Sequence, residues 1–198
     1  SCSGRAIVGG LFSVGLSLDK MESLAYSLSW RDFARFAFSR KSLVTSDPMG
    51  KLLKGLVGNP VIGDCQIPFA ALSTDLLTGE GVVLNGPEME LGTVLRASSS
   101  FPGIYKPIKL NDRYLVDGGA SHNIPTKVVR DMGADIVIAV DVIPYSPLTH
   151  VPRHMAALLD RGLDLLLRAV SKKMANDADF VLQPVSVQVT SFQVKKAS

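Results

Sequence analysis

The sequence contains few of the residues that mark several classes of protein. Its 198 residues include two cysteines, one tryptophan and three histidines. Cys2 and Cys65 stand in unrelated contexts, which argues against a disulfide framework or a cysteine-based metal site. No apolar run reaches the roughly 18 residues that a membrane-spanning helix requires. The net charge of +3 is small and comes without a basic stripe carrying aromatic residues, so nucleic acid is not an expected partner.

The residues that are present give the composition of an ordinary globular domain, 46% hydrophobic and 20% charged, in which one core is expected. Periodicity and turn residues predict a first helix that ends near residue 15, followed by helices over 18–28, 46–58, 89–97, 125–132 and 151–173. The same signals predict strands over 68–73, 82–84, 114–116, 136–140 and 179–182. The alternation of the two between residues 67 and 142 indicates an α/β layered fold.

Three segments carry more specific expectations. Residues 136–140 are a continuous apolar run, typical of a strand buried on both faces in a parallel sheet. Residues 151–173 are amphipathic, which favours a helix packed on the core, with a helix in the membrane interface as the alternative. An aromatic cluster is expected in the core, with an acyl-chain groove or a membrane-facing lid as the alternative. The cluster consists of Trp30, Phe33, Phe36 and Phe38.

One carboxylate stands at the end of a predicted strand. Residues 114–116 are apolar, and the turn pair Asn111-Asp112 before them suggests a hairpin. Asp117 follows, and the glycine pair 118–119 lets the backbone turn away sharply. Strand ends are where α/β proteins place their chemistry, which makes Asp117 a candidate catalytic residue. The alternative is that its carboxylate merely accepts hydrogen bonds from amides of the turn.

A serine stands at the start of the first predicted helix. Residues 1–12 are a turn of small residues that runs into an apolar, glycine-containing helix without a polar face. The hydroxyl of Ser3 would lie near unpaired amides and the positive end of the helix dipole, as in a nucleophile elbow. The alternative is that Ser1 or Ser3 is simply the N-cap of that helix.

Three blocks of this sequence together resemble patatin-like phospholipases. Residues 1–11 read SCSGRAIVGGL and resemble the elbow of that family, residues 96–103 read RASSSFPG and resemble its middle block, and residues 115–119 read LVDGG and resemble its Asp-Gly-Gly block. Residues 67–79 and 132–141 are also similar to bacterial members. The blocks stand in family order over roughly residues 1–144, which is far more specific than any single block.

The resemblance implies a fold and a catalytic site. The implied fold is α/β, a three-layer patatin-like fold with a mostly parallel central sheet flanked by helices. The implied site is a Ser-Asp dyad without histidine, which corresponds here to Ser3 and Asp117. Gly4, directly after the serine, would supply an oxyanion-hole amide. No metal or cofactor is implied.

The sequence departs from the family pattern around the elbow. Glycines flank the family's serine at two residues before and two after, whereas this sequence has Ser1 and Arg5. The family's preceding strand and glycine-rich loop, which supply further oxyanion-hole amides, are not in these residues. We therefore expect residues 1–184 to be an N-terminally incomplete patatin-like domain, much less active in this form or inactive, with a variant that lacks the central strand as the alternative. Residues 185–198 are expected to be a tail or edge strand.

The function that follows is hydrolysis of phospholipids or related acyl esters, with Ser3 as nucleophile and Asp117 as base. The alternative is a catalytically impaired relative that binds lipid or a protein partner, which Arg5 favours. We expect a cytoplasmic protein that contacts membrane surfaces transiently, while a signal peptide upstream and the oligomeric state stay open. Other polar candidates are expected to be structural: Asp75, Ser98, Ser99, Ser100, His122, and the pair His150 and His154.

Overall fold

The structure is a computed structural model that describes residues 4–27, 35–39, 42–122, 124–142, 148, 150–175 and 177–184. Of the predicted aromatic cluster, Trp30 and Phe33 lie outside the described residues, and only the backbone of Phe36 and Phe38 is described. The chain divides into two compact units, with the boundary after Ser121.

The helices of the first unit follow the predicted pattern. They are α1 (Gly4–Ser13), α2 (Leu18–Ser27), α4 (Asp47–Val57) and α5 (Leu91–Ser98), with short 3-10 turns η1 (Ile62–Asp64) and η2 (Gly118–Ala120). In α4, Pro48 stands in the first turn, where a missing N–H costs nothing. Gly58, with φ of 75°, ends α4 and donates its N–H to the Lys54 carbonyl. The proline expected near the start is confirmed, and of the two glycines expected near the end, Gly55 and Gly58, it is Gly58 that ends the helix.

The strands that the structure describes in the first unit pair in antiparallel fashion. Strands β1 (Arg35–Ser39) and β2 (Ser42–Thr45) form one pair. Strands β3 (Ala71–Asp75), β4 (Gly81–Leu84), β5 (Ile108–Leu110) and β6 (Arg113–Asp117) form a sheet in the order β4-β3-β6-β5. Every neighbouring pair in this sheet is antiparallel.

The prediction of a mostly parallel central sheet is therefore wrong for the part of the chain that the structure describes. The physical reason lies in the connections, because β3–β4 and β5–β6 are hairpins whose short links cannot cross over to a parallel partner. Asn111 and Asp112 form the β5–β6 turn with φ of 45° and 59°. Two successive positive φ values are typical of the tight hairpin turn that the sequence predicted.

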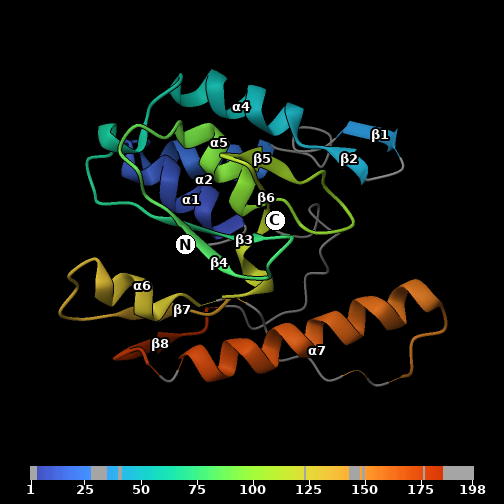
Figure 1. Ribbon diagram of the computed structural model, residues 1–198. Coiled ribbons are helices and arrows are strands. Elements are labelled where there is room, and N and C mark those ends of the chain that lie inside the picture. Colours follow the sequence, from blue (N-terminus) through green and yellow to red (C-terminus); the bar gives the residue numbers. More distant parts are fainter. Residues whose placement is uncertain are drawn as a thin grey trace. The chain divides into compact units, whose positions relative to one another are not determined.

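The core of the first unit lies between this sheet and the helices. Helix α5 contacts β3 and β6, and α1 and α4 in turn contact α5. Figure 1 shows α4 running across α5 on the side away from the sheet. The most completely buried side chains of this core are Ala6, Ala71, Leu84, Leu91, Val94, Leu95, Ala97 and Leu115.

The second unit is small. It contains α6 (Thr126–Asp131), β7 (Ile138–Val140), α7 (Met155–Ala175) and β8 (Phe180–Leu182). The predicted strands at β7 and β8 are confirmed, and they pair in parallel. Within this unit β7 is not buried on both faces as predicted, because Ile138 and Val140 are exposed and only Ala139 is buried. The predicted tail, residues 185–198, lies outside the described residues.

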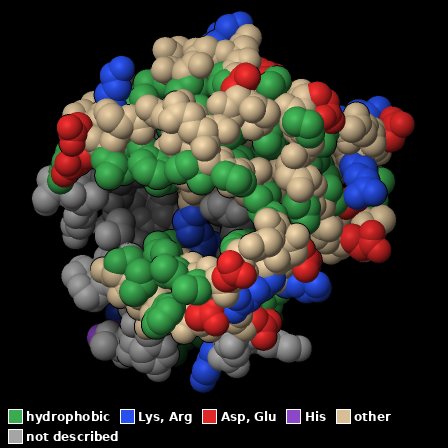
Figure 2. Space-filling view, turned by 90° about the vertical axis from the view of Figure 1, so that its left-hand side faces the viewer, with side chains coloured by type: hydrophobic (Ala, Val, Ile, Leu, Met, Phe, Trp, Pro, Cys, Tyr) green, Lys and Arg blue, Asp and Glu red, His purple; other side chains and the backbone are tan. Residues whose placement is uncertain are grey.

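Within the second unit, helix α7 leaves much of its apolar side uncovered. Met155, Leu159 and Leu166 are exposed to 78%, 70% and 66% of their surface. A helix of 21 residues carries a longer apolar stripe than the few other elements of its unit can cover. Figure 2 shows hydrophobic side chains at the surface of the molecule. Within the described ranges, no helix combines the length and the apolar character needed to cross a bilayer.

Candidate active site

Asp117 is the last residue of β6 and is buried, with 3% of its surface exposed. It lies directly opposite Ser73 of β3 in the antiparallel register. Its backbone N–H donates to the carbonyl of Ser100, 2.9 Å away, in the segment that follows α5. The predicted place of the carboxylate at a strand end is thus confirmed, although of the apolar residues before it Leu115 and Val116 are buried and Tyr114 is exposed.

The turn after Asp117 fixes the direction of the carboxylate. Asp117 Oδ1 accepts a hydrogen bond from the Gly119 N–H at 2.7 Å, so the side chain caps η2. Gly118 makes this turn possible, because an added Cβ would lie 2.2 Å from the carbonyl oxygen of Leu72 in β3. No side chain larger than hydrogen fits there without moving the strand.

Two hydroxyl groups that sequence reasoning missed also hold this turn. Thr74 Oγ1 donates to the Asp117 carbonyl at 3.1 Å and lies 2.8 Å from Ser121 Oγ. The only signal in the sequence was a hydroxyl residue near the end of a predicted strand. That signal does not say which turn the hydroxyl reaches.

The other predicted half of the site, Ser3, lies outside the described residues. Gly4, the residue after it, begins α1. The first amides of a helix have no acceptor within the helix, which is the arrangement the prediction required of Gly4. Arg5 is half-buried in the same turn, so an arginine at this position is compatible with the helix.

Helix α1 is anchored closely to the elements that carry Asp117. A Cβ added to Gly10 would lie 2.7 Å from Leu95 Cδ2 and 3.3 Å from Phe69 Cζ, so the glycine allows α1 and α5 to approach. Helix α5 in turn packs on β6, the strand that ends at Asp117. The N-terminal helix and the buried carboxylate therefore belong to one packed unit.

Comparison with known proteins places the chain in a family. A family profile described as patatin-like phospholipase matches residues 2–130. The chain belongs to the patatin-like phospholipase family. The match includes the elbow residues, all four strands of the antiparallel sheet and Asp117.

Curated relatives of this patatin-like chain cover a similar region. An uncharacterized NTE family protein of Mycobacterium tuberculosis (strain H37Rv) is 32% identical over 141 residues, which is 69% of this chain and 38% of that protein. A patatin-like phospholipase domain-containing protein of Caenorhabditis elegans is 30% identical over 146 residues, 69% of this chain and 11% of that protein. The chain thus spans well under half the length of either relative.

Three polar residues that were expected to be structural, Ser98, Ser100 and Asp75, each make a hydrogen bond with the backbone. Ser98 Oγ donates to the Leu72 carbonyl at 2.6 Å, and Ser100 Oγ donates to the Arg96 carbonyl at 2.7 Å. Asp75 is also buried, and its Oδ1 accepts the N–H of Leu77 at 3.0 Å. Each of these groups therefore has a backbone partner that accounts for its position.

The histidines take no part in a cluster of potential metal ligands. The nitrogen Nδ1 of His122 is buried and makes no hydrogen bond. His150 and His154 are four residues apart in the sequence and stand just before α7. Among the residues that the structure describes, no three histidine, cysteine or acidic side chains gather where they could hold a metal ion.

Among the described residues, Tyr105 and Asp179 have shifted pKa values that local structure explains. Burial raises the pKa of the Tyr105 phenol above its ordinary value. The pKa of Asp179 is lowered, first by the hydrogen bond that its carboxylate accepts from the Val137 N–H, and further by Arg130. Val137 N lies 2.7 Å and Arg130 Nη2 lies 2.5 Å from the same oxygen, Asp179 Oδ2.

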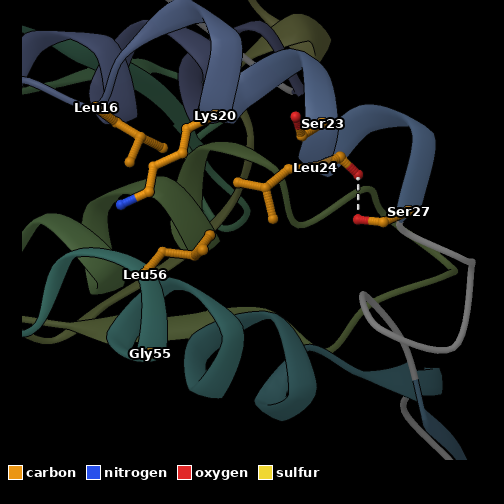
Figure 3. A pocket seen from close by; sticks show the side chains of 7 residues that line it. All are labelled: Leu16, Lys20, Ser23, Leu24, Ser27, Gly55 and Leu56. Atoms are coloured by element: carbon orange, nitrogen blue, oxygen red, sulfur yellow. Dashed lines mark hydrogen bonds between the residues drawn. The ribbon is translucent and has the colours of Figure 1, made fainter.

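A shallow groove of about 400 Å³ lies between α2 and α4. Figure 3 shows its lining side chains, which are Leu16, Lys20, Ser23, Leu24, Ser27, Gly55 and Leu56. The hydroxyl of Ser27 donates to the Leu24 carbonyl of its own helix at 3.1 Å. Asp117 is not among the described residues that line this groove.

Proposed function

We propose that the protein is a serine lipid acyl hydrolase in which Ser3 is the nucleophile and Asp117 the general base. The observation that carries the proposal is the setting of Asp117. Its carboxylate is buried at a strand end, held by the Gly119 N–H, and lies within the segment matched to patatin-like phospholipases. A buried carboxylate with a fixed direction suits proton transfer better than a solvated one, because it needs no reorganisation.

The proposed reaction has two steps. Ser3 Oγ attacks the ester carbonyl while its proton passes to Asp117, and the tetrahedral intermediate collapses to release the alcohol, which takes that proton. The acyl group remains on Ser3. Water then attacks the acyl-enzyme, Asp117 again accepts a proton, and the acid leaves as Ser3 regains its hydroxyl.

Stabilisation of the oxyanion is assigned to the start of α1. The N–H of Gly4 stands in the first turn of α1, at the positive end of the helix dipole. Removal of one such donor typically costs 10²–10³ in kcat in enzymes of this kind. An aspartate is a weak base at neutral pH, so this electrostatic stabilisation has to supply most of the rate enhancement.

The substrate class we propose is a phospholipid or another acyl ester, and no metal or cofactor takes part in the proposed steps. The competing function is a patatin-like protein that binds lipid or a protein partner without hydrolysing it. Arg5 favours that function, because the family pattern has glycine at this position of the elbow. The test below separates the two.

The test measures ester turnover by the natural full-length protein and by three variants. Ser3→Ala and Asp117→Asn should each lower kcat by at least about 10³-fold, as expected for a nucleophile and its base. Asp75→Asn is the matched control, because Asp75 is an equally buried carboxylate of the same sheet that also accepts a backbone N–H. Asp75→Asn should retain turnover in its folded fraction.

Three results would count against the hydrolase. The first is the absence of turnover in the wild-type protein together with retained binding to lipid vesicles, which would favour the binding function. The second is turnover that survives Ser3→Ala. The third is an equal loss of turnover in Asp75→Asn and Asp117→Asn. That result would mean that both buried carboxylates of the sheet serve only the fold.

A further inference from the structure

The turn that carries Asp117 is tied to the neighbouring strand by a pair of hydroxyl groups. Thr74 is buried in β3, with 6% of its surface exposed. Its Oγ1 donates to the backbone carbonyl of Asp117 at 3.1 Å and lies 2.8 Å from Ser121 Oγ. Asp117 and Ser121 stand directly before and directly after η2. One threonine side chain therefore contacts both ends of the turn.

The direction of these hydrogen bonds follows from proton counting. Thr74 has a single hydroxyl proton, and a backbone carbonyl can only accept, so that proton goes to the Asp117 carbonyl. Ser121 must then donate to Thr74 Oγ1. The Gly118 carbonyl, at 3.5 Å from Ser121 Oγ, is a much poorer acceptor for the same proton. The result is a relay from Ser121 through Thr74 to Asp117.

We infer that Thr74 is a positioning residue for the catalytic base, an inference that rests on the proposed function of Asp117. Strand pairing and the Ser100 carbonyl fix the N–H side of Asp117, and the Gly119 N–H fixes its carboxylate. The Thr74 hydroxyl fixes the carbonyl between them, at the point where the chain leaves the strand. Without that contact the turn can rotate, and the carboxylate rotates with it.

Such a rotation should lower kcat much more than it lowers the stability of the fold. A displacement of about 1 Å in a reacting group can reduce the rate by about 10²-fold. A single buried hydrogen bond, by contrast, contributes only a modest share of stability. Loss of the Thr74 hydroxyl should thus lower kcat strongly while the fold and substrate binding persist.

The test compares two substitutions that separate the hydroxyl from the methyl group. Thr74→Val keeps the shape and β-branching of threonine but removes the hydroxyl, whereas Thr74→Ser keeps the hydroxyl and removes the methyl group. Valine is the better strand former, so a purely structural role would favour Thr74→Val. A positioning role predicts the opposite order in kcat, with Thr74→Val lowered by at least about 10-fold and Thr74→Ser within about 3-fold of wild type.

Thr126→Val is the matched control. Thr126 is also a buried threonine, and its Oγ1 donates to the Met174 carbonyl at 3.2 Å in the second unit. The substitution removes the same kind of hydrogen bond and should leave kcat unchanged. KM should change little in any of the three variants, since Thr74 is not proposed to touch substrate.

A second readout does not depend on activity. Hydrogen exchange of the Gly119 N–H, which is bonded to the Asp117 carboxylate, should be about tenfold faster in Thr74→Val and unchanged in Thr74→Ser and Thr126→Val. Unchanged Gly119 exchange in Thr74→Val would overturn the inference whether or not the protein is a hydrolase. Wild-type kcat in Thr74→Val, or equal losses in Thr74→Val and Thr74→Ser, would overturn it in an active enzyme. Absent wild-type turnover would instead count against the proposed function, and exchange would still decide whether Thr74 holds the turn.

Discussion

Gly118→Ala is the substitution that most directly probes how closely the Asp117 turn approaches the sheet. The added Cβ would lie 2.2 Å from the Leu72 carbonyl oxygen, 2.6 Å from its carbon and 3.0 Å from the Leu72 Cβ. Two of these atoms are backbone atoms of a buried strand, which cannot move aside like the end of a flexible side chain. Relief of the overlap requires the turn and β3 to separate by about 1 Å. A closely packed core resists a displacement of this size.

The expected cost is therefore at the upper end of overpacking effects, about 3 kcal/mol in the free energy of unfolding. With a denaturant slope of about 2 kcal/mol/M, the urea midpoint should fall by about 1.5 M. Circular dichroism during urea unfolding measures this directly. The surviving folded fraction should also lose activity, because the carboxylate turn has moved.

Gly55→Ala is the control for the general effect of adding a methyl group to glycine. Gly55 lies within α4, and an added Cβ would meet nothing within 4 Å. Alanine there should stabilise the protein by about 0.5–1 kcal/mol, through helix propensity and the unfolded chain. A Gly118→Ala protein as stable as wild type would refute the close approach on which the description of the site rests.

Two further predictions concern the packing and the charges. Leu95→Ala should destabilise the first unit by about 2–5 kcal/mol, because Leu95 is fully buried in the core where α5 meets α1. Urea unfolding measures this loss of stability. A loss below about 1 kcal/mol would contradict the described packing. The lowered pKa of Asp179 means that its carboxylate contributes stability above its unfolded pKa of about 4, and that this contribution is lost as the pH falls through the lower folded value. Asp179→Asn should thus be less stable than wild type at pH 7, and the difference should shrink below about pH 4; a constant difference across that range would contradict the assigned contacts with Val137 and Arg130.

Local signals predicted much of the secondary structure. The Asn111-Asp112 pair predicted a tight hairpin, and both residues have the positive φ that such a turn requires. Pro48 predicted where α4 begins, and of the two glycines that could mark its end, Gly55 and Gly58, the structure selects Gly58. These features depend on the backbone preferences of a few adjacent residues, and those preferences can be read directly from the sequence.

The strand directions and the extent of burial could not be predicted in the same way. The antiparallel pairing of β3 with β6 joins Ser73 to Asp117, residues far apart in the chain, and no local pattern encodes that choice. The apolar run at β7 predicted burial, but burial depends on which elements cover the strand. The same reason explains why the apolar stripe of α7 did not predict its packing.

The candidate site shows the same division. The position of Asp117 at a strand end was predicted from an apolar run followed by glycines, and its family block supported the role. The contact from Thr74 was not predicted, because it joins two strands across the sheet. Tertiary contacts of this kind hold the carboxylate, and they are visible only when the strands are placed side by side.

The central claim is that a hydroxyl at the start of the chain reacts with the help of the carboxylate at the end of β6. Covalent labelling with a fluorophosphonate, with the modified residue identified by mass spectrometry, tests it most directly. The account predicts modification at Ser3 in the natural full-length protein, no modification in Ser3→Ala, and labelling slowed by at least about 10²-fold in Asp117→Asn. Labelling at another serine, or labelling of Ser3 at the wild-type rate in Asp117→Asn, would contradict it.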